Sequence, residues 1–361
     1  MLIVCILLGF TAAKTIGIDP YFHYHKPKTE EYSYALNNER CQNDGIVRHF
    51  DYSGLIAGSS MAENFKTSDA ESLWGGIFVK VAFSGATYRE ISENLAAALK
   101  SNAGLKTVIR AVDMSGLAQH KDAMKYDQSQ YPLYLYDDDP LNDVRYLFNR
   151  DVVFSRLYPM TKAKSSPDFT AGITTFDRYA NWMRGQHFGK NAVAPDGITA
   201  PETDRLVHLP ATTAEKIRSN ITQNITAQAE QYPDVEFYCF FTPYSAVWWR
   251  NQVDKGTVYQ QIEMEELVIE EMLKCPNIRL FSFNCFYDLT TNLNHYKDYA
   301  HYGEWVNTYI LQCMHDGCGL ITAENYEDYL EEELQFYTAY DYTQLNDQED
   351  YDDDRSAAGL L

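Results

Sequence analysis

The chain has 361 residues, 45% of them hydrophobic and 22% charged, which is typical of a folded globular protein that can bury a sizeable core. Its formal net charge of −21 excludes proteins that bind the phosphate backbone of nucleic acid through a basic surface. The seven cysteines form neither a Cys-x-x-Cys pair nor a zinc pattern, and the histidines show no metal-ligand spacing beyond His23-x-His25. We therefore expect no disulfide scaffold, no metal and no cofactor.

The first residues of the chain form an apolar run that Lys14 ends. The run is shorter than the roughly 20 residues that cross a bilayer, and it lacks the basic region that precedes the core of a signal peptide. We interpret residues 1–18 as a signal-anchor-like segment and residues 19–48 as an aromatic stem. A buried first strand is the alternative. The interpretation predicts an extracytoplasmic protein attached to a membrane through its N-terminal segment, or a secreted one.

Short apolar segments alternate with helical patterns along much of the chain. Thr87 and Glu90 fit a capping box at the start of a helix over Tyr88–Leu99, and further helices are expected over 213–231 and 259–273. Buried strands are expected at five positions: 52–57, 78–83, 107–112, 236–241 and 278–283. This alternation predicts an α/β fold with a parallel sheet of about five strands and helices on both faces.

The pattern is interrupted between residues 116 and 210, after the third expected strand. This insertion is too long to lack structure altogether, and helices are expected over 142–154 and 176–183. Insertions at the carboxyl ends of parallel strands commonly line a ligand crevice, so we expect a lid or substrate wall. Residues 324–361 are strongly acidic and are expected to form a solvated helix and a disordered tail, which leaves 49–323 as the main domain.

Ser60 follows the first expected strand in the run Gly58-Ser59-Ser60-Met61. A sharp turn from a strand into a helix would expose this serine at the carboxyl edge of the sheet, where a nearby general base can activate it. A helix cap or a serine turn is the alternative for the same triplet.

Asp298 and His301 follow the fifth expected strand with a spacing of three residues. An aspartate at this spacing can accept a hydrogen bond from the imidazole and fix its tautomer. A helix cap with a surface histidine is the alternative. Because the first and fifth strands end at the same edge of a parallel sheet, the sequence favours a Ser60–His301–Asp298 triad.

These motifs resemble those of the SGNH (GDSL-like) hydrolase superfamily, in particular the D-alanine-transfer protein of teichoic-acid D-alanylation and, more distantly, alginate-type O-acetyltransferase subunits. The resemblance covers roughly residues 50–115 and 213–312. It implies a three-layer, flavodoxin-like fold in which Ser60 is the nucleophile, His301 the base and Asp298 the residue that orients it. It also implies that the backbone amides of Ser60 and Gly85 form the oxyanion hole.

One position departs from the superfamily. Where a Gly-x-Asn-Asp motif would supply an asparagine after the third strand, this chain has Asp113, which cannot donate a hydrogen bond unless it is protonated. The departure favours acyl transfer over plain ester hydrolysis. After the fourth strand, Tyr244, Trp248 and Trp249 are candidates for a substrate-binding wall, with a core aromatic cluster as the alternative.

The sequence thus predicts a serine-dependent acyltransferase or esterase that forms an acyl-enzyme on Ser60. An acyl donor and a glycan or polyol acceptor are the expected substrates, and the resemblance admits a membrane-bound O-acyltransferase as a partner. A catalytically inert surface protein that uses the same fold to bind glycan is the alternative.

Overall fold

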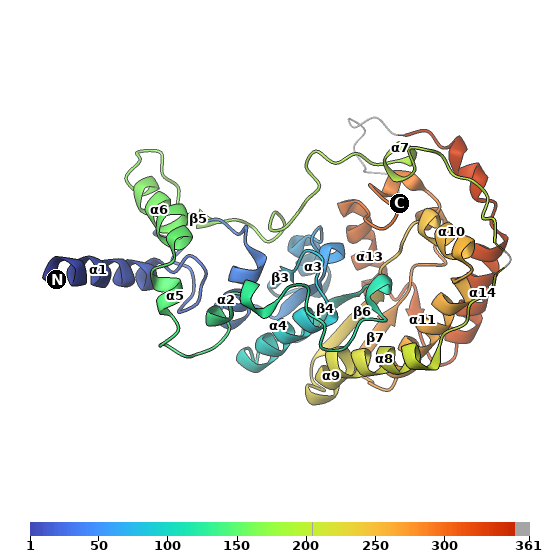
Figure 1. The fold of residues 1–361 in the computed structure, drawn as a ribbon, viewed down its shortest axis with the longest axis horizontal. Helices are drawn as coiled ribbons and strands as arrows, with labels where there is room; N and C mark the ends of the chain where they lie inside the picture. The colour runs from blue at the N-terminus through green and yellow to red at the C-terminus, as the bar shows by residue number, and fades with distance from the viewer. Residues whose placement is uncertain (204, 351–361) are drawn as a thin grey trace.

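The computed structural model describes residues 1–203 and 205–350. Its centre is a six-stranded sheet in the order β3-β2-β4-β6-β7-β8, parallel except for the last strand (Figure 1). Numbered along the chain within this sheet, the five parallel strands take the order 2-1-3-4-5, which is the flavodoxin-like order. The strands span Gly54–Gly58 (β2), Phe78–Ala82 (β3), Thr107–Val112 (β4), Glu236–Phe241 (β6), Ile278–Phe281 (β7) and Leu320–Ile321 (β8).

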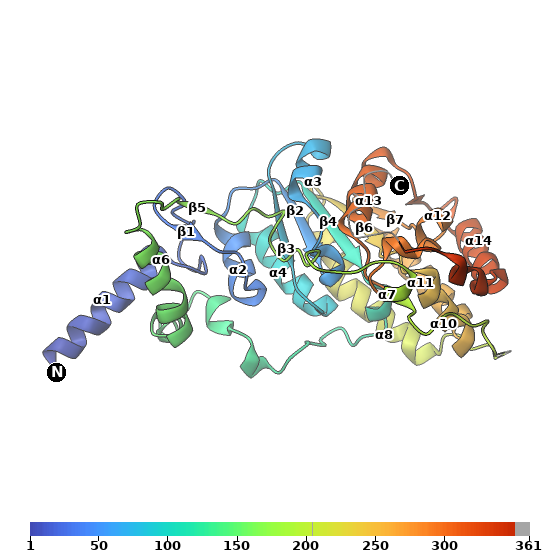
Figure 2. The same cartoon turned by 90° about the horizontal axis from the view of Figure 1, so that it is seen from above.

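Helices cover both faces of this sheet and make three layers (Figure 2). One layer joins α2 and α4 to the helical stretch of residues 211–231 and to α11, and on the other face α3 packs against α13. The bounds are Glu39–His49 (α2), Thr67–Trp74 (α3), Tyr88–Ser101 (α4), Ala211–Ile221 (α8), a π-helix at Thr222–Thr226, Ala227–Gln231 (α9), Val258–Met272 (α11) and Glu304–Asp316 (α13). The expected α/β fold, a parallel sheet of about five strands with helices on both faces, is confirmed, and the antiparallel β8 adds a sixth strand that was not expected.

Local sequence explains where these elements begin. The predicted capping box at α4 is present, because the Thr87 side chain accepts from the Glu90 amide and the Glu90 carboxylate accepts from the Thr87 amide. All five residues of β2 and of β3 are buried, as strands between two helical layers must be, and Lys80 in β3 is the one charged residue among them. A shorter helix, Ala246–Lys255 (α10), follows β6.

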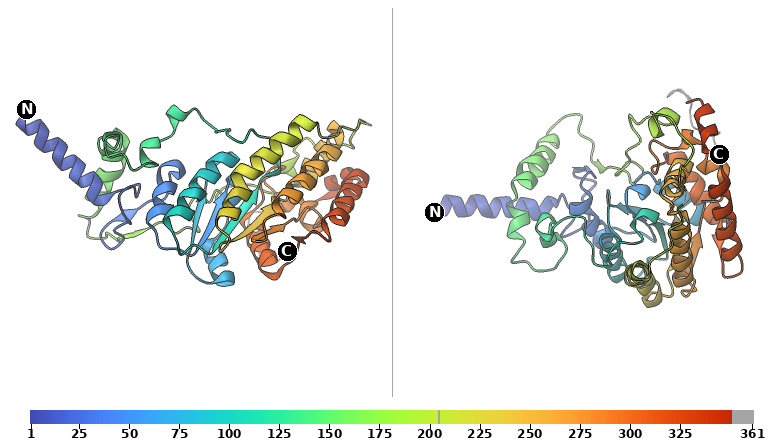
Figure 3. Two further views of the ribbon diagram at one scale, coloured as in Figure 1. Left: turned by 90° about the horizontal axis from the view of Figure 1, so that it is seen from below. Right: turned by 45° about the vertical axis from the view of Figure 1, so that its right-hand side comes forward.

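Residues 1–28 and 141–164, here called the N-terminal lobe, lie together at one end of the molecule and join the core of the main domain through buried Phe22 (Figures 1 and 3). Helix α1 projects from it and packs at its base against α5 and a π-helix. No helix in the described part of the chain has the length and apolar character to cross a membrane. The lobe contains Leu2–Ile18 (α1), Val144–Leu147 (α5), the π-helix Asp151–Leu157 and Tyr158–Ala163 (α6).

The N-terminal segment differs from two expectations. Residues 2–18 are helical with mostly exposed side chains, so a buried first strand is wrong. The following residues do not extend as a stem: Asp19 and Phe22 are fully buried, and the Asp19 carboxylate accepts hydrogen bonds from the amides of His23, Tyr24 and His25. Helix α2 crosses the expected domain boundary at residue 49 and packs on α4 and β3.

The insertion and the C-terminal region differ from their expected structure. The helix expected over 142–154 is instead α5 and the start of the π-helix, and 176–183 contains turns and no helix. The C-terminal helix is not simply solvated, because α14 packs on α10 and α11 through buried Leu330, Glu333 and Tyr337. The expected disordered tail falls partly on residues 351–361, which lie outside the described residues. The remaining elements are Ser33–Tyr34 (β1), Gly172–Ile173 (β5), Lys190–Val193 (α7), Tyr287–Thr290 (α12) and Tyr326–Ala339 (α14).

Candidate active site

The turn after β2 places Ser60 at the carboxyl end of the strand, as the first residue of the 3-10 turn Ser60–Ala62. Gly58 is required there, because a Cβ at this position would lie 2.7 Å from the Cβ of Ala62 and 3.0 Å from that of Ala111. The cap of the short helix is Ser59, whose hydroxyl accepts from the Met61 amide at 3.3 Å. Ser60 itself is half-buried, and its hydroxyl is left for another partner.

That partner is His301. The Ser60 Oγ lies 2.9 Å from His301 Nε2, and His301 Nδ1 lies 2.9 Å from an oxygen of Asp298. Because an ionised carboxylate only accepts hydrogen bonds, the proton sits on Nδ1 and leaves Nε2 to accept from the serine hydroxyl. The structure therefore brings the three predicted residues into one chain of hydrogen bonds.

A tight loop holds this pair of side chains. Tyr296 and Tyr302 form an antiparallel bridge, and the Lys297 amide donates to the His301 carbonyl at 3.0 Å. Inside the loop, one oxygen of Asp298 accepts from the amides of Ala300 at 2.9 Å and His301 at 2.8 Å. Burial raises the pKa of Asp298, but these hydrogen bonds and the one from the imidazole outweigh it and lower the pKa to about 2.

Trp182, from the insertion, covers the histidine. Its ring meets the imidazole edge-on with 5.7 Å between the ring centres, and its Nε1 lies 3.4 Å from the Ser60 carbonyl oxygen. The Trp182 amide donates to Asn64, and the Lys297 ammonium stands 4.3 Å from the centre of the indole ring. The sequence placed the insertion near the site but did not identify Trp182, whose only signal was its position in a segment rich in aromatic residues.

A buried lysine in β3 stabilises the turn that contains Ser60. Lys80 lies in the middle of β3 with no exposed surface, and its ammonium donates to the carbonyls of Glu63 and Phe65, the latter at 2.8 Å. Burial lowers the pKa of Lys80 to about 7, against the charges of Asp177 and Glu63, which raise it. The lysine thus holds the backbone that follows Ser60 in place. The sequence did not reveal this role, because it shows only a single charged residue inside an apolar run.

Asp113 follows β4, the strand beside β2, and its carboxyl adjoins Ser59 and His301. Burial raises its pKa, and the interactions with Ser59 and with His301 oppose that shift. Its Oδ1 is buried and has no hydrogen-bond partner among the described residues. The position at which the sequence resemblance implied an asparagine therefore holds a buried carboxyl group.

The predicted oxyanion donors lie at the ends of adjacent strands. Gly58 pairs with Ala82, so Ser60 and Gly85 follow the paired ends of β2 and β3 by two and three residues. Within residues 1–203 and 205–350, no hydrogen bond from either amide to another protein group is found. Gly85 has φ = 60°, and a Cβ there would approach the Lys125 ammonium at 2.5 Å, so a side chain would be strained.

The predicted substrate wall is packed inside the protein. Tyr244, Trp248 and Trp249 are all buried, and Trp249 stacks on Tyr337 of α14 with ring centres 4.3 Å apart. The Tyr244 hydroxyl lies 3.1 Å from that of Ser115. These contacts fit the alternative of a core aromatic cluster, because none of the three rings offers a free face to a substrate.

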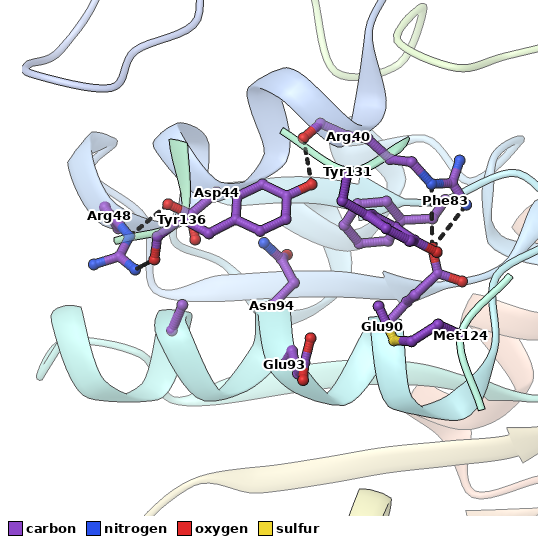
Figure 4. A pocket seen from close by; sticks show the side chains of 11 residues that line it. Arg40, Asp44, Arg48, Phe83, Glu90, Glu93, Asn94, Met124, Tyr131 and Tyr136 are labelled. Carbon is purple, nitrogen blue, oxygen red and sulfur yellow. Dashed lines mark hydrogen bonds and ion pairs between the residues drawn. The ribbon is translucent and has the colours of Figure 1, made fainter. Parts of the chain in front are cut away.

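A cavity of about 220 Å³ lies between α2 and α4, and the triad residues are not part of its lining (Figure 4). Its charged groups are largely paired with one another. Arg40 binds Glu90 at 2.9 Å, and Arg48 binds Asp44 at 2.6 Å. The full lining is Arg40, Asp44, Arg48, Phe83, Glu90, Glu93, Asn94, Ala97, Met124, Tyr131 and Tyr136.

Comparisons with known proteins add little to this geometry. No protein-family model matches the chain, and no curated protein does. One solved structure, described as that of "a putative platelet activating factor from Streptococcus pneumonia", aligns with 81% of this chain and 91% of its own, at 12% identity and a TM-score of 0.37. Such a likeness carries no functional argument, so the site must be judged on its own chemistry.

Proposed function

We propose that this protein is a serine-dependent acyl hydrolase or acyltransferase in which Ser60 forms the acyl-enzyme. The observation that carries the proposal is the 2.9 Å contact between Ser60 Oγ and His301 Nε2, continued to Asp298. A serine hydroxyl gains nucleophilicity only beside such a base, and the histidine is held in the required tautomer by the carboxylate.

The first half-reaction forms the ester on the enzyme. His301 Nε2 takes the hydroxyl proton while Ser60 Oγ attacks the carbonyl carbon of an acyl donor. The bond to the donor's leaving oxygen then breaks, and His301 returns the proton to that oxygen. The Ser60 and Gly85 amides are the proposed donors to the transient oxyanion, each worth a few kcal/mol in the transition state.

The second half-reaction releases the acyl group. His301 takes a proton from an acceptor hydroxyl, the acceptor oxygen attacks the acyl carbon, and Ser60 leaves with its proton restored. Water as acceptor gives hydrolysis, and a sugar or polyol hydroxyl gives transfer. We propose a glycan or polyol of the cell surface as the acceptor and an extracytoplasmic location for the enzyme.

The inert glycan-binding alternative has less support. It would be favoured if Ser60 and His301 stood more than about 5 Å apart, beyond the reach of proton transfer. Their side chains are in hydrogen-bond contact instead, with a third residue orienting the base.

Labelling with a fluorophosphonate probe tests the nucleophile. The wild-type protein is expected to react covalently and Ser60→Ala to lose the label completely, because the attacking oxygen is gone. Ser84→Ala, which changes an exposed serine at the end of β3, is the matched control and keeps the label. Labelling of Ser60→Ala at the wild-type level would refute the proposal.

Intact mass separates transfer from hydrolysis. After exposure to p-nitrophenyl acetate, the wild-type protein is expected to gain one acetyl group, and Ser60→Ala none. A glycan or polyol that acts as acceptor shortens the lifetime of that species and appears as the acetylated product. Decay at a rate independent of the added hydroxyl compound, with acetate as the sole product, would assign hydrolysis.

A further inference from the structure

The exposed apolar side chains of this protein are concentrated in the N-terminal lobe. Helix α1 is apolar around almost its whole circumference, and eight of its large side chains are exposed. The helix itself extends away from the sheet (Figures 1 and 3). The second part of the lobe exposes another group: Leu141, Val144, Phe148, Phe154 and Tyr158. Exposed apolar side chains gathered into a patch mark a site of contact with a partner or a membrane.

The charge of the lobe is opposite to that of the whole chain. Residues 1–28 and 141–164 contain eight lysines and arginines against three acidic residues, in a chain whose net charge is −21. Arg145, Arg150 and Lys162 are exposed among the apolar residues of the second part, whereas the exposed Lys164 pairs with Glu31 at 3.1 Å. A basic and apolar surface on an acidic protein is complementary to anionic groups next to an apolar phase.

The residues of the second part also have the order expected at a membrane surface. Phe154, Tyr158 and Lys162 are spaced four apart along the continuous helical stretch 151–163, and Phe154 and Tyr158 are 66% and 61% exposed. Aromatic rings flanked by lysine are enriched where a protein meets the boundary between acyl chains and headgroups.

The two parts of the lobe are fixed to each other at the base of α1. The Thr15 hydroxyl donates to the Leu147 carbonyl at 3.1 Å, and the Tyr146 hydroxyl donates to the Asp19 carboxylate at 2.7 Å. His23 and Tyr24 reach the Asp143 carboxylate at 3.0 and 2.9 Å. A surface that received α1 would therefore also meet the segment 141–164 in a set orientation.

We propose that residues 141–164, together with α1, form a docking surface for an anionic lipid bilayer, in which the acyl chains receive the apolar side chains and the headgroups bind the basic ones. The surface is independent of the triad, so its failure would leave the proposed acyl chemistry untouched, and the reverse also holds.

Vesicle binding of the full chain tests the proposal. The wild-type protein is expected to sediment with vesicles of phosphatidylcholine mixed with phosphatidylglycerol, less well with phosphatidylcholine alone, and less well as salt is added. Reversing two charges in Arg150→Glu/Lys162→Glu is expected to weaken partitioning into the mixed vesicles about 30-fold. Phe154→Ala/Tyr158→Ala is expected to weaken partitioning into both vesicle types.

Matched controls lie on the main domain. Lys106→Glu/Lys216→Glu reverses two exposed charges, and Ile77→Ala/Leu206→Ala removes two exposed apolar side chains, without touching the lobe. Both are expected to bind as the wild type does. If the two lobe variants bound vesicles as the wild type does, the proposed role of residues 141–164 would be overturned, even if α1 alone bound lipid.

A second copy of the chain is the competing occupant. Sedimentation without lipid would then show self-association that the lobe variants abolish, and vesicles would be bound with no preference for anionic headgroups. That result would overturn the proposal. A melting temperature and a far-ultraviolet circular dichroism spectrum unchanged from the wild type show that the lobe variants are folded.

Discussion

Asp298 illustrates how a few backbone contacts prepare a side chain for chemistry. Two amides of its own loop donate to one of its oxygens, so the carboxylate is oriented before the imidazole binds it. With a pKa of about 2, the group stays ionised throughout the pH range in which a protein of this kind is handled. It can therefore stabilise the imidazolium of His301 electrostatically without accepting the proton itself.

Asp113 has the opposite character, because burial makes its ionised form unfavourable. A carboxylate there would repel an oxyanion that forms on Ser60, whereas an amide would donate to it. We therefore expect Asp113→Asn to raise kcat/KM for a simple soluble ester once the pH is high enough to ionise Asp113 in the wild type, by about tenfold or more, the scale of one oxyanion donor. Steady-state kinetics across a range of pH measure this. Asp122→Asn, at an exposed carboxylate, is the control, and an unchanged or lower rate in Asp113→Asn would contradict the prediction.

The same substitution has a defined effect on stability. The pKa of Asp113 is raised in the folded state, so the wild-type protein is penalised as pH rises above the unfolded value of about 3.8. Asp113→Asn is therefore expected to unfold at a higher temperature than the wild type at neutral pH, with the difference vanishing at low pH.

At the scale of elements, the insertion contributes to the site through one residue. Trp182 packs on His301 and reaches the Ser60 carbonyl, so the segment 176–183 restrains both members of the proposed catalytic pair. Trp182→Ala is expected to lower kcat for a small ester roughly 10- to 100-fold with a smaller change in KM, because the pair loses its alignment.

Trp182→Phe is the matched variant for that prediction. It keeps an aromatic edge against the imidazole and loses only the long contact of Nε1, so most of the activity is expected to remain. Equal losses in both variants would show that the hydrogen bond, not the packing, matters. Wild-type kcat in Trp182→Ala would contradict the restraining role of the segment.

The elements of the sheet were predictable because their signals are local. Thr107–Val112 and Glu236–Phe241 occur with the predicted bounds, since a strand buried on both faces reads as one apolar run between polar ends. The order of the strands then brought the predicted Ser60, His301 and Asp298 together, although the sequence could not show the distances between them. Their catalytic roles remain predictions.

Features that depend on tertiary contacts were not predictable. Lys80 occurs in a run that reads as an ordinary apolar strand, and only the carbonyls of Glu63 and Phe65 explain how its charge is buried. The pattern around Tyr244, Trp248 and Trp249 is equally compatible with a pocket wall and with a core. Aromatic residues are found in both places, so the sequence does not show whether one face of a ring stays open to a ligand. The helix expected over 176–183 is absent, and that segment is instead held by contacts to the main domain, such as the hydrogen bond that the Trp182 amide donates to the Asn64 side chain.

The whole molecule combines a large negative charge with carboxyl groups that burial keeps from ionising. The pKa values of Glu63, Glu265 and Glu333 are all raised, first by burial, and the charge of Glu265 raises that of Glu333 further. The folded protein thus holds protons that the unfolded chain releases above a pH of about 4.5, so folding is favoured most below that value and less as pH rises. Lys80, with a pKa of about 7, acts in the opposite sense only above neutrality.

Buried His295, whose pKa is lowered to about 4, acts in the opposite sense below its ordinary value of 6.5. We therefore expect the three buried carboxyl groups to make the melting temperature fall between pH 5 and pH 7 against this opposing effect. Glu333→Gln should make this fall smaller by a few degrees, because a neutral amide has no proton to lose. Scanning calorimetry at closely spaced pH values measures the slope. Glu331→Gln, on the exposed side of the same helix α14, removes one charge without changing a buried group and should keep the wild-type slope. A fall of the same size in Glu333→Gln as in the wild type would mean that Glu333 is not a group whose ionisation opposes folding.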